Sequence, residues 1–230
     1  MDLGSLERAA AAEGLSLRGA FRPEAADGVP DLPDGRPART LALLGNAGPG
    51  LWPVVAAAPE LADGNADPLD RWSARVIGGL AARLGAQALF PFGAPHRPFV
   101  AWAKRAEPVA ESPLGMLIHP DHGLWHAYRG ALAFAEEIAL PPRGTRPRPC
   151  DDCADRPCLA ACPVGAFTEM GYDVAACAGH IAVPAGADCL DLGCRARRAC
   201  PVGREAQYGP AQARFHMAAF LKVLPAGAPA

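Results

Sequence analysis

The sequence predicts an α+β sheet domain followed by a small cysteine-rich metal domain. Amphipathic helix-like segments alternate with short apolar runs through the first 140 residues, which indicates helices and strands packed around one core. All eight cysteines lie beyond that part, between residues 150 and 200. Half of the residues are hydrophobic and 20% are charged, so a core is available and global disorder is excluded.

The chain is expected to begin with a helix at 4–14, which Gly14 ends, and a strand at 15–22, where apolar and polar residues alternate. Residues 24–38 are rich in Gly, Pro and Asp, which indicates a loop. A second strand is expected at 40–46, because a short apolar run ends there in turn residues.

The clearest helix signal covers residues 67–85. Asp67 is a natural N-cap, Pro68 occupies the first helical position and Gly85 ends the helix. Apolar residues recur at helical spacing and are expected to form its buried stripe: Leu69, Trp72, Val76, Leu80 and Leu84.

The remaining elements follow from similar signals. Turn residues and apolar runs predict strands at 88–92, 114–120 and 123–134, the last two joined around Pro120–Asp121, and helices at 99–106 and 208–222. The expected division is a sheet domain at 1–140, a Pro- and Arg-rich linker at 141–149, a cysteine domain at 150–205 and a C-terminal helix and tail at 206–230.

Charge and hydropathy exclude several classes of function. The net charge is −2, which argues against a general nucleic-acid or membrane-surface binder. A run of about 18 apolar residues, the length that spans a bilayer, does not occur. The N-terminus lacks the basic start and apolar stretch of a secretory signal, so we expect a cytoplasmic protein without nucleic-acid or membrane partners.

The eight cysteines form two sets that both end in the tetrapeptide C-P-V-G, at 162–165 and 200–203. The first set has the spacing C-x2-C-x4-C-x3-C-P, and in two-cluster proteins the cysteine before the proline ligates the other cluster. Reciprocal exchange predicts two [4Fe–4S] sites that use every cysteine once. One comprises Cys150, Cys153, Cys158 and Cys200, and the other comprises Cys162, Cys177, Cys189 and Cys194.

The metal at these cysteines and the role of the arginines beside them each have a second interpretation. A pair of four-cysteine zinc sites also takes thiolates at C-x2-C spacing, although zinc does not need the proline or the crossed pattern. The basic residues Arg195, Arg197 and Arg198 lie between two ligands, where they either raise a cluster's reduction potential or form a basic surface for a redox partner protein.

The cysteine segment resembles the dicluster ferredoxin domain. More narrowly, the lone cysteine in DVAACAGHIA (173–182), followed by GC (193–194) and CP (200–201), is similar to the epoxyqueuosine reductase family. That resemblance, shared with reductive dehalogenases, implies electron transfer from two [4Fe–4S] clusters to a cobalamin.

The N-terminal part carries a second resemblance. The stretch SPLGMLIHPDHGLWHAYRGALAF (112–134) is similar to epoxyqueuosine reductases and to cobalamin-processing, decyanating proteins of the CblC type, and residues 67–85 resemble a helix of the latter. The resemblance implies a nitroreductase- or flavin-reductase-like sheet that holds cobalamin or, as the weaker alternative, FMN.

Six residues of this stretch are the candidate cofactor ligands: His119, His122, Gly123, Trp125, His126 and Arg129. Imidazoles can ligate cobalt, an indole can lie on a ring system and a guanidinium can hold a phosphate or amide oxygen. On one strand His122, His126 and Tyr128 would share a face. The simpler interpretation is that His119 ends a strand and Trp125 fills the core, as we also expect of Trp72 and Trp102.

One departure from the epoxyqueuosine reductases concerns their proton-donating aspartate. The matching stretch PFGAPHRPF (91–99) has no carboxylate, Gly93 stands near that place and His96 is the nearest substitute. The sequence also ends without the family's C-terminal repeat region, so we expect corrinoid reduction or decyanation rather than epoxyqueuosine reduction. The alternatives are a ferredoxin-like electron carrier without its own catalytic cofactor and a flavin-dependent reductase.

Overall fold

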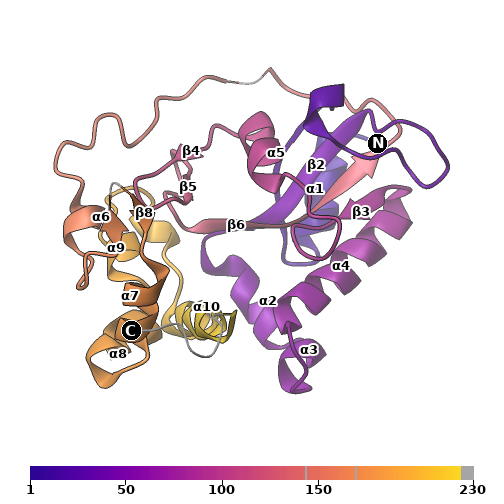
Figure 1. The fold of residues 1–230 in the computed structure, drawn as a ribbon. Helices are drawn as coiled ribbons and strands as arrows, with labels where there is room; N and C mark the ends of the chain where they lie inside the picture. The colour runs from indigo at the N-terminus through magenta and orange to yellow at the C-terminus, as the bar shows by residue number, and fades with distance from the viewer. Residues whose placement is uncertain (143, 169, 224–230) are drawn as a thin grey trace. The chain divides into compact units, whose positions relative to one another are not determined.

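The computed structural model describes residues 1–142, 144–168 and 170–223. The chain divides into two compact units (Figure 1). The sheet unit comprises Met1–Pro108 and His126–Thr145, and the cysteine unit comprises Val109–Trp125 and Arg146–Ala230. This division differs from the boundary expected at residue 140, because Val109–Trp125 groups with the cysteine-rich segment.

The sheet unit is built on a four-stranded antiparallel sheet, and its mixture of helix and sheet confirms the α+β class. Its strands lie in the order β1-β2-β6-β3. Their bounds are β1 Ser16–Phe21, β2 Thr40–Ala47, β6 His126–Phe134 and β3 Gln87–Leu89. In the register, Leu43 pairs with Ala131 and Ala88 pairs with Leu132.

Strand β2 forms the centre of the core, since residues 40–46 are all buried. Helices α1 (Leu3–Ala11) and α5 (Phe99–Ala106) pack against β1, and α4 (Pro68–Leu84) packs along β6 and β3. The predicted stripe of α4 is confirmed at four of its positions, while Leu84 is half-buried. The buried stripe residues are Leu69, Trp72, Val76 and Leu80.

Several local expectations for the sheet unit were wrong. Asp67 precedes α4 with φ 50° and makes no side-chain capping hydrogen bond, so the helix start relies on Pro68. Two short helices, α2 (Trp52–Ala56) and α3 (Pro59–Ala62), form where none was expected. Single-turn η1 (Ala25–Asp27) and η2 (Gly48–Leu51) complete the unit.

The expected hairpin over 114–134 does not form. Strand β5 (Leu117–Ile118) pairs instead with β4 (Ala110–Glu111) in the cysteine unit, whereas β6 joins the main sheet. A single bridge between His119 and Gly123 closes the turn that follows β5. The long apolar stretch therefore contributes to two sheets rather than to one.

The cysteine unit consists of short elements. They are α6 (Pro157–Ala160), β7 (Phe167–Thr168), β8 (Gly171–Tyr172), α7 (Val174–Ile181), η3 (Pro184–Gly186), α8 (Ala187–Leu192), α9 (Arg195–Arg198), η4 (Arg204–Ala206) and α10 (Pro210–Val223). Helix α10 matches the expected C-terminal helix and packs against α8. Across the described residues, no helix is long and apolar enough to cross a membrane.

Candidate functional site

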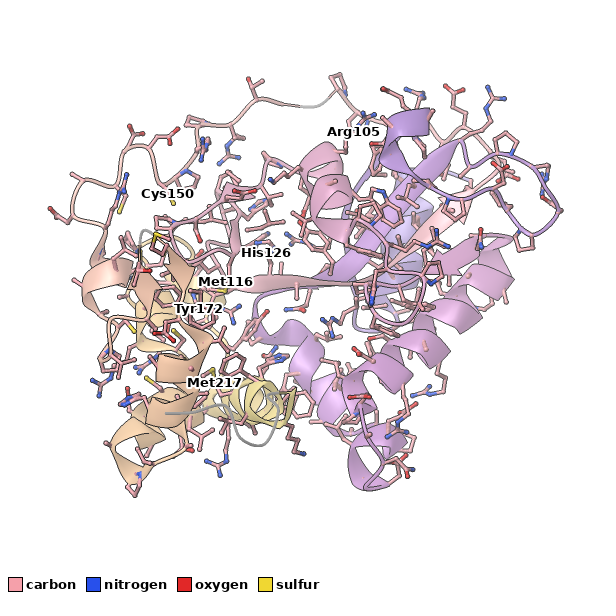
Figure 2. The ribbon with its side chains drawn as sticks, viewed as in Figure 1. Arg105, Met116, His126, Cys150, Tyr172 and Met217 are labelled. Atoms are coloured by element: carbon pink, nitrogen blue, oxygen red, sulfur yellow. The ribbon has the colours of Figure 1, made fainter. Side chains whose placement is uncertain are left out.

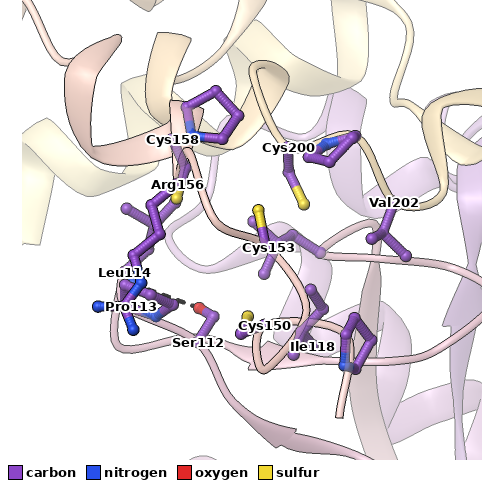
Figure 3. Close-up of a pocket in the computed structure, with 14 residues that line it drawn as sticks. Ser112, Pro113, Leu114, Ile118, Cys150, Cys153, Arg156, Cys158, Cys200 and Val202 are labelled. Carbon is purple, nitrogen blue, oxygen red and sulfur yellow. Dashed lines mark hydrogen bonds between the residues drawn. The ribbon is translucent and has the colours of Figure 1, made fainter. Parts of the chain in front are cut away.

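Four cysteines surround one hollow in the cysteine unit (Figure 3). Cys158 lies on α6 and Cys200 follows α9, and these two helices pack on each other. Cys150 and Cys153 come from the segment before α6. Burial raises the pKa of the Cys150 thiol, and Cys200, Cys158 and Cys153 raise it further. The four thiols are therefore near enough to repel one another as thiolates.

The other four cysteines form a second group, in which Cys177 is central. Burial raises the pKa of the Cys177 thiol, a hydrogen bond with Tyr172 lowers it, and neighbouring Cys162 and Cys189 raise it. Burial also raises the pKa of Cys194, with further contributions from Cys177 and Cys189. The thiols of Cys162, Cys189 and Cys194 therefore lie near that of Cys177, and the crossed ligation stays a prediction.

The ligand type and number of each group fit an iron–sulfur cluster. All eight cysteines are free thiols, and thiolates are the usual ligands of such clusters. No group of three or more His, Cys, Asp or Glu side chains that could hold a metal ion occurs among the described residues as they are placed. The cluster assignment therefore rests on the convergence of four thiols in each group, and it remains a proposal.

Hydrogen-bond donors surround the second group. The backbone N–H of Ala166 donates to Cys162 Sγ at 3.3 Å. The backbone N–H groups of Ala196 and Arg197 lower the pKa of Cys194, against the larger effect of burial. Donors to sulfur stabilise the more negative, reduced state of a cluster, so they would raise the reduction potential of a cluster held by these thiols.

The three arginines of α9 have different partners. Arg195 Nε donates to Asp188 Oδ2 at 2.6 Å, and Arg198 forms an ion pair with the same carboxylate. Arg197 instead donates to the backbone carbonyl of Leu124 from Nε at 3.1 Å and from Nη2 at 2.5 Å. The three arginines therefore do not act alike, so neither a raised reduction potential nor a basic docking surface describes all three.

The structure places His119, His122 and Gly123 together in one turn of the cysteine unit. His119 is buried, and its Nδ1 accepts the backbone N–H groups of Asp121 at 3.1 Å and His122 at 3.3 Å. The rings of His119 and His122 stack at 4.7 Å. Gly123 has φ 56°, and a Cβ there would lie 2.0 Å from the Val202 carbonyl oxygen. These contacts give His119 and Gly123 local structural roles.

The other three candidates do not join that turn. Trp125 is buried in the cysteine unit, where its ring meets the edge of Tyr208 at 5.3 Å. His126 and Arg129 belong to β6 in the sheet unit. The rings of His126 and Tyr128 pack edge-on with their centroids 5.8 Å apart, which agrees with their expected shared face. Arg129 Nη1 lies 3.6 Å from Asp70 Oδ1. The six candidates are thus divided between the two units.

Sequence reasoning missed a buried polar cluster in the sheet unit. Glu107 accepts hydrogen bonds from Arg18 Nη2 at 3.1 Å and from the Tyr128 hydroxyl at 2.6 Å. Arg18 is 2% exposed and Glu107 is 8% exposed. Gly19 allows the close approach of β1 to the end of α5, because a Cβ there would lie 2.5 Å from the Ala106 carbonyl oxygen. No local pattern signals this pairing.

The 91–99 stretch adds no acid to the sheet unit. His96 is exposed on the loop between β3 and α5. Gly93 lies on the same loop with φ 74°, and no atom lies within 4 Å of the position that a Cβ would take there. The buried carboxyl nearest in sequence is Glu107, which already pairs with Arg18.

No protein-family model and no curated protein matches this chain. Three solved structures of epoxyqueuosine reductase are similar to it. One, with a tRNA-Tyr epoxyqueuosine-modified tRNA stem loop, has a TM-score of 0.52 and 15% identity over 90% of this chain and 66% of that chain. The Streptococcus thermophilus enzyme has a TM-score of 0.48 and 16% identity over 90% of this chain and 67% of that chain. A selenomethionine-labelled enzyme has a TM-score of 0.48 and 14% identity over 92% of this chain and 68% of that chain.

At 15% identity, the first of these likenesses shows a shared fold. This chain spans slightly less than two thirds of that solved chain. That protein was solved with a tRNA stem loop, so net charge alone does not decide whether a chain of this fold binds nucleic acid. That structure is not one of a CblC-type protein, so the second resemblance stays a prediction.

Proposed function

We propose that this protein is an iron–sulfur oxidoreductase that passes single electrons through two [4Fe–4S] clusters to an acceptor. The observation that carries this proposal is the convergence of Cys150, Cys153, Cys158 and Cys200 around one hollow. Five of the thiols have a raised pKa, and the cysteines that raise each of these pKa values most belong to the same set as that thiol. The fold likeness to epoxyqueuosine reductase supports the same class of chemistry.

The chain's own residues would hold and tune the clusters. Cys150, Cys153, Cys158 and Cys200 would ligate the first, and Cys162, Cys177, Cys189 and Cys194 the second. Bound clusters supply one-electron transfer. The Ala166 amide and the Tyr172 hydroxyl lie against thiols of the second set, where they would favour its reduced state.

A modified nucleoside in RNA is the acceptor class that the comparison favours. The first similar structure was solved with an epoxyqueuosine-modified tRNA stem loop. Nothing in that comparison speaks for a corrinoid or a flavin. The missing carboxylate at 91–99 means that the proton for such a reduction would come from a different group than in the resembled family.

Pairs of cysteine variants test the clusters and their crossed ligation together. Anaerobically reconstituted full-length protein should hold about eight irons per chain, the content of two [4Fe–4S] clusters. Under crossed ligation, Cys153→Ser with Cys200→Ser removes one cluster and leaves about half of the iron. Cys153→Ser with Cys162→Ser then removes both clusters.

Sequential ligation predicts the opposite result for the two pairs, so each is the matched control of the other. Two tightly bound zinc ions and no iron would overturn the proposal. Mixing the reduced protein with an epoxyqueuosine-modified stem loop, and separately with hydroxocobalamin, then identifies the acceptor. Cluster reoxidation by the RNA alone supports the RNA substrate, and reoxidation by cobalamin alone restores the corrinoid interpretation.

A further inference from the structure

One turn of the cysteine unit, residues 119–123, adjoins the hollow of the first cysteine group. Two backbone hydrogen bonds close the turn. The N–H of His119 donates to the Gly123 carbonyl at 2.8 Å, and the N–H of Gly123 donates to the His119 carbonyl at 2.9 Å. Ile118 before the turn (Figure 3) and Leu124 after it both line the hollow. A change in the turn would therefore reach the wall of that hollow.

The turn meets the C-P-V-G ending at 200–203 backbone to backbone. Gly123 and Gly203 both have positive φ, 56° and 68°. A Cβ at Gly123 would overlap the carbonyl of Val202. A Cβ at Gly203 would overlap the carbonyl of His122 and the nitrogen of Gly123. Glycine at both places permits this close approach, so the turn fixes the position of the peptide between Val202 and Gly203.

The other C-P-V-G ending, at 162–165, is not covered in this way. Its Gly165 has φ 60°, close to that of Gly203, but no atom of the described residues lies within 4 Å of the position that a Cβ would take there. Cys200 is buried, whereas Cys162 is only half-buried. Two identical tetrapeptides thus lie in different surroundings, and the turn covers the one that carries Cys200.

Val202 connects the turn with the thiol of Cys200. The Val202 carbonyl faces Gly123. The Val202 N–H donates to the Cys200 thiol and lowers the pKa of that thiol, against the larger effect of burial. An N–H that donates to a ligand sulfur stabilises the reduced state of a cluster. Movement of this peptide would therefore change a reduction potential as well as a position.

His119 holds the turn in shape from within. It is 7% exposed, and its Nδ1 accepts the N–H groups of Asp121 and His122 at 3.1 Å and 3.3 Å. The Asp121 carboxylate accepts from Arg146 Nη2 at 2.8 Å, and Arg146 lies four positions before Cys150 (Figure 2). The turn thus contacts both segments that supply the first cysteine group, the one that leads to Cys150 and the C-P-V-G ending.

We propose that His119 is a positioning residue for the first cluster, acting through the 119–123 turn and Val202 on the ligand Cys200. The inference rests on the proposed function, since it needs a cluster on the first cysteine group. It gives His119 a role that requires no corrinoid or flavin, because the Nδ1 lone pair already accepts two backbone N–H groups.

Redox titration of the reconstituted full-length protein, followed by electron paramagnetic resonance, measures the potential of each cluster. The double variant Cys177→Ser, Cys189→Ser removes the second cluster and so identifies the signal of the first. His119→Leu keeps an apolar side chain of similar bulk but removes the acceptor. We expect a lower potential for the first cluster alone, and loss of about four of about eight irons to a chelator roughly tenfold faster than in the wild type.

His119→Asn is the rescue variant. Oδ1 of asparagine lies as many bonds from the backbone as Nδ1 of histidine, so it can accept the same two N–H groups. We expect wild-type potentials and wild-type iron retention. If His119 only filled space, leucine, which is closer to it in bulk, would be tolerated better than asparagine.

The two C-P-V-G endings supply a matched pair of variants. Gly203→Ala and Gly165→Ala carry a similar backbone cost, because both glycines have positive φ. Only Gly203→Ala displaces the 119–123 turn, so it should lower the potential of the first cluster. Gly165→Ala should leave that potential unchanged.

Three results would overturn the proposal. One is that His119→Leu leaves the first cluster unchanged or shifts both clusters alike. Another is that His119→Asn behaves as His119→Leu does. The last is that Gly203→Ala and Gly165→Ala affect the first cluster equally, and this pair decides the matter where His119→Leu fails to fold.

The proposed function fails by a different result, a wild-type protein with two zinc ions and no iron. The role of the turn is then tested on the zinc at Cys200, with the same variants and the same chelator. Faster loss of that zinc from His119→Leu and Gly203→Ala, but not from His119→Asn or Gly165→Ala, supports the positioning role. Equal rates for all four variants contradict it.

Discussion

The hydroxyl of Tyr128 donates a 2.6 Å hydrogen bond to Glu107 in the interior of the sheet unit. Arg18 Nη2 forms an ion pair with Oε1 of the same carboxylate at 3.0 Å. Burial raises the pKa of Glu107, against the lowering effects of the Arg18 charge and of the hydrogen bonds from Tyr128 and Arg18. The three side chains thus form one hydrogen-bonded cluster, in which Arg18 and Tyr128 offset the cost of burying the Glu107 carboxylate.

Glu107→Gln should destabilise the sheet unit strongly, because it leaves Arg18 buried without a counter-charge. Breaking a buried pair in this way typically costs about 3–5 kcal/mol. Tyr128→Phe is the control, since it removes only one hydrogen bond to a charged group, worth about 1.5–3 kcal/mol. Urea unfolding followed by tryptophan fluorescence measures both, and a larger loss for Tyr128→Phe would refute this account of the cluster.

Acid should destabilise the sheet unit through Asp63. Hydrogen bonds from Arg71, followed by the Asn65 amide, lower the pKa of Asp63 from 3.8 to about 2. The folded state therefore binds this proton less readily than the unfolded state. The stabilisation is fully present above pH 3.8 and is lost as the pH falls toward 2.

Asp63→Asn removes that contribution, so its free energy of unfolding should fall less steeply between pH 4 and pH 2 than that of the wild type. Urea titrations at several pH values measure the two slopes. Asp31→Asn replaces another exposed aspartate of the sheet unit and is the control. Identical slopes for wild type and Asp63→Asn would contradict the prediction.

Gly123→Ala should damage the cysteine unit more than Gly115→Ala. Both glycines have positive φ, 56° and 72°, so both alanines carry a backbone cost of roughly 1–2 kcal/mol. Only the Cβ at 123 would also lie 2.0 Å from the Val202 carbonyl oxygen, whereas nothing lies within 4 Å at 115. Thermal unfolding and iron retention of the two variants measure the difference, and equal losses would show that close packing at 123 is unimportant.

Removal of iron should unfold the cysteine unit while the sheet unit keeps its structure. The small core of the cysteine unit includes Cys158 and Cys200 themselves, so metal binding must supply part of its folding energy. Hydrogen exchange after anaerobic chelation should show lost protection at about 145–205 and retained protection in β2 and α4. Restoring iron is the control, and full protection of the apo segment would contradict the prediction.

The sequence by itself determined the features that depend on local spacing. Helix α4 and strand β2 could be predicted because their apolar periodicity and end signals lie within each segment. The two cysteine sets rest on the same kind of local signal, a repeated C-P-V-G ending and fixed spacings, and they stay a prediction.

Only the tertiary structure decided the features that join distant segments. The stretch 112–134 reads as one hairpin, yet β5 pairs with β4 and β6 with the main sheet, because pairing depends on which strand edges are available. Arg195, Arg197 and Arg198 are equivalent in sequence, and Asp188 and Trp125 distinguish them in space. The partner of Glu107 lies 89 positions away in β1, and only the packing of α5 against that strand brings the two together.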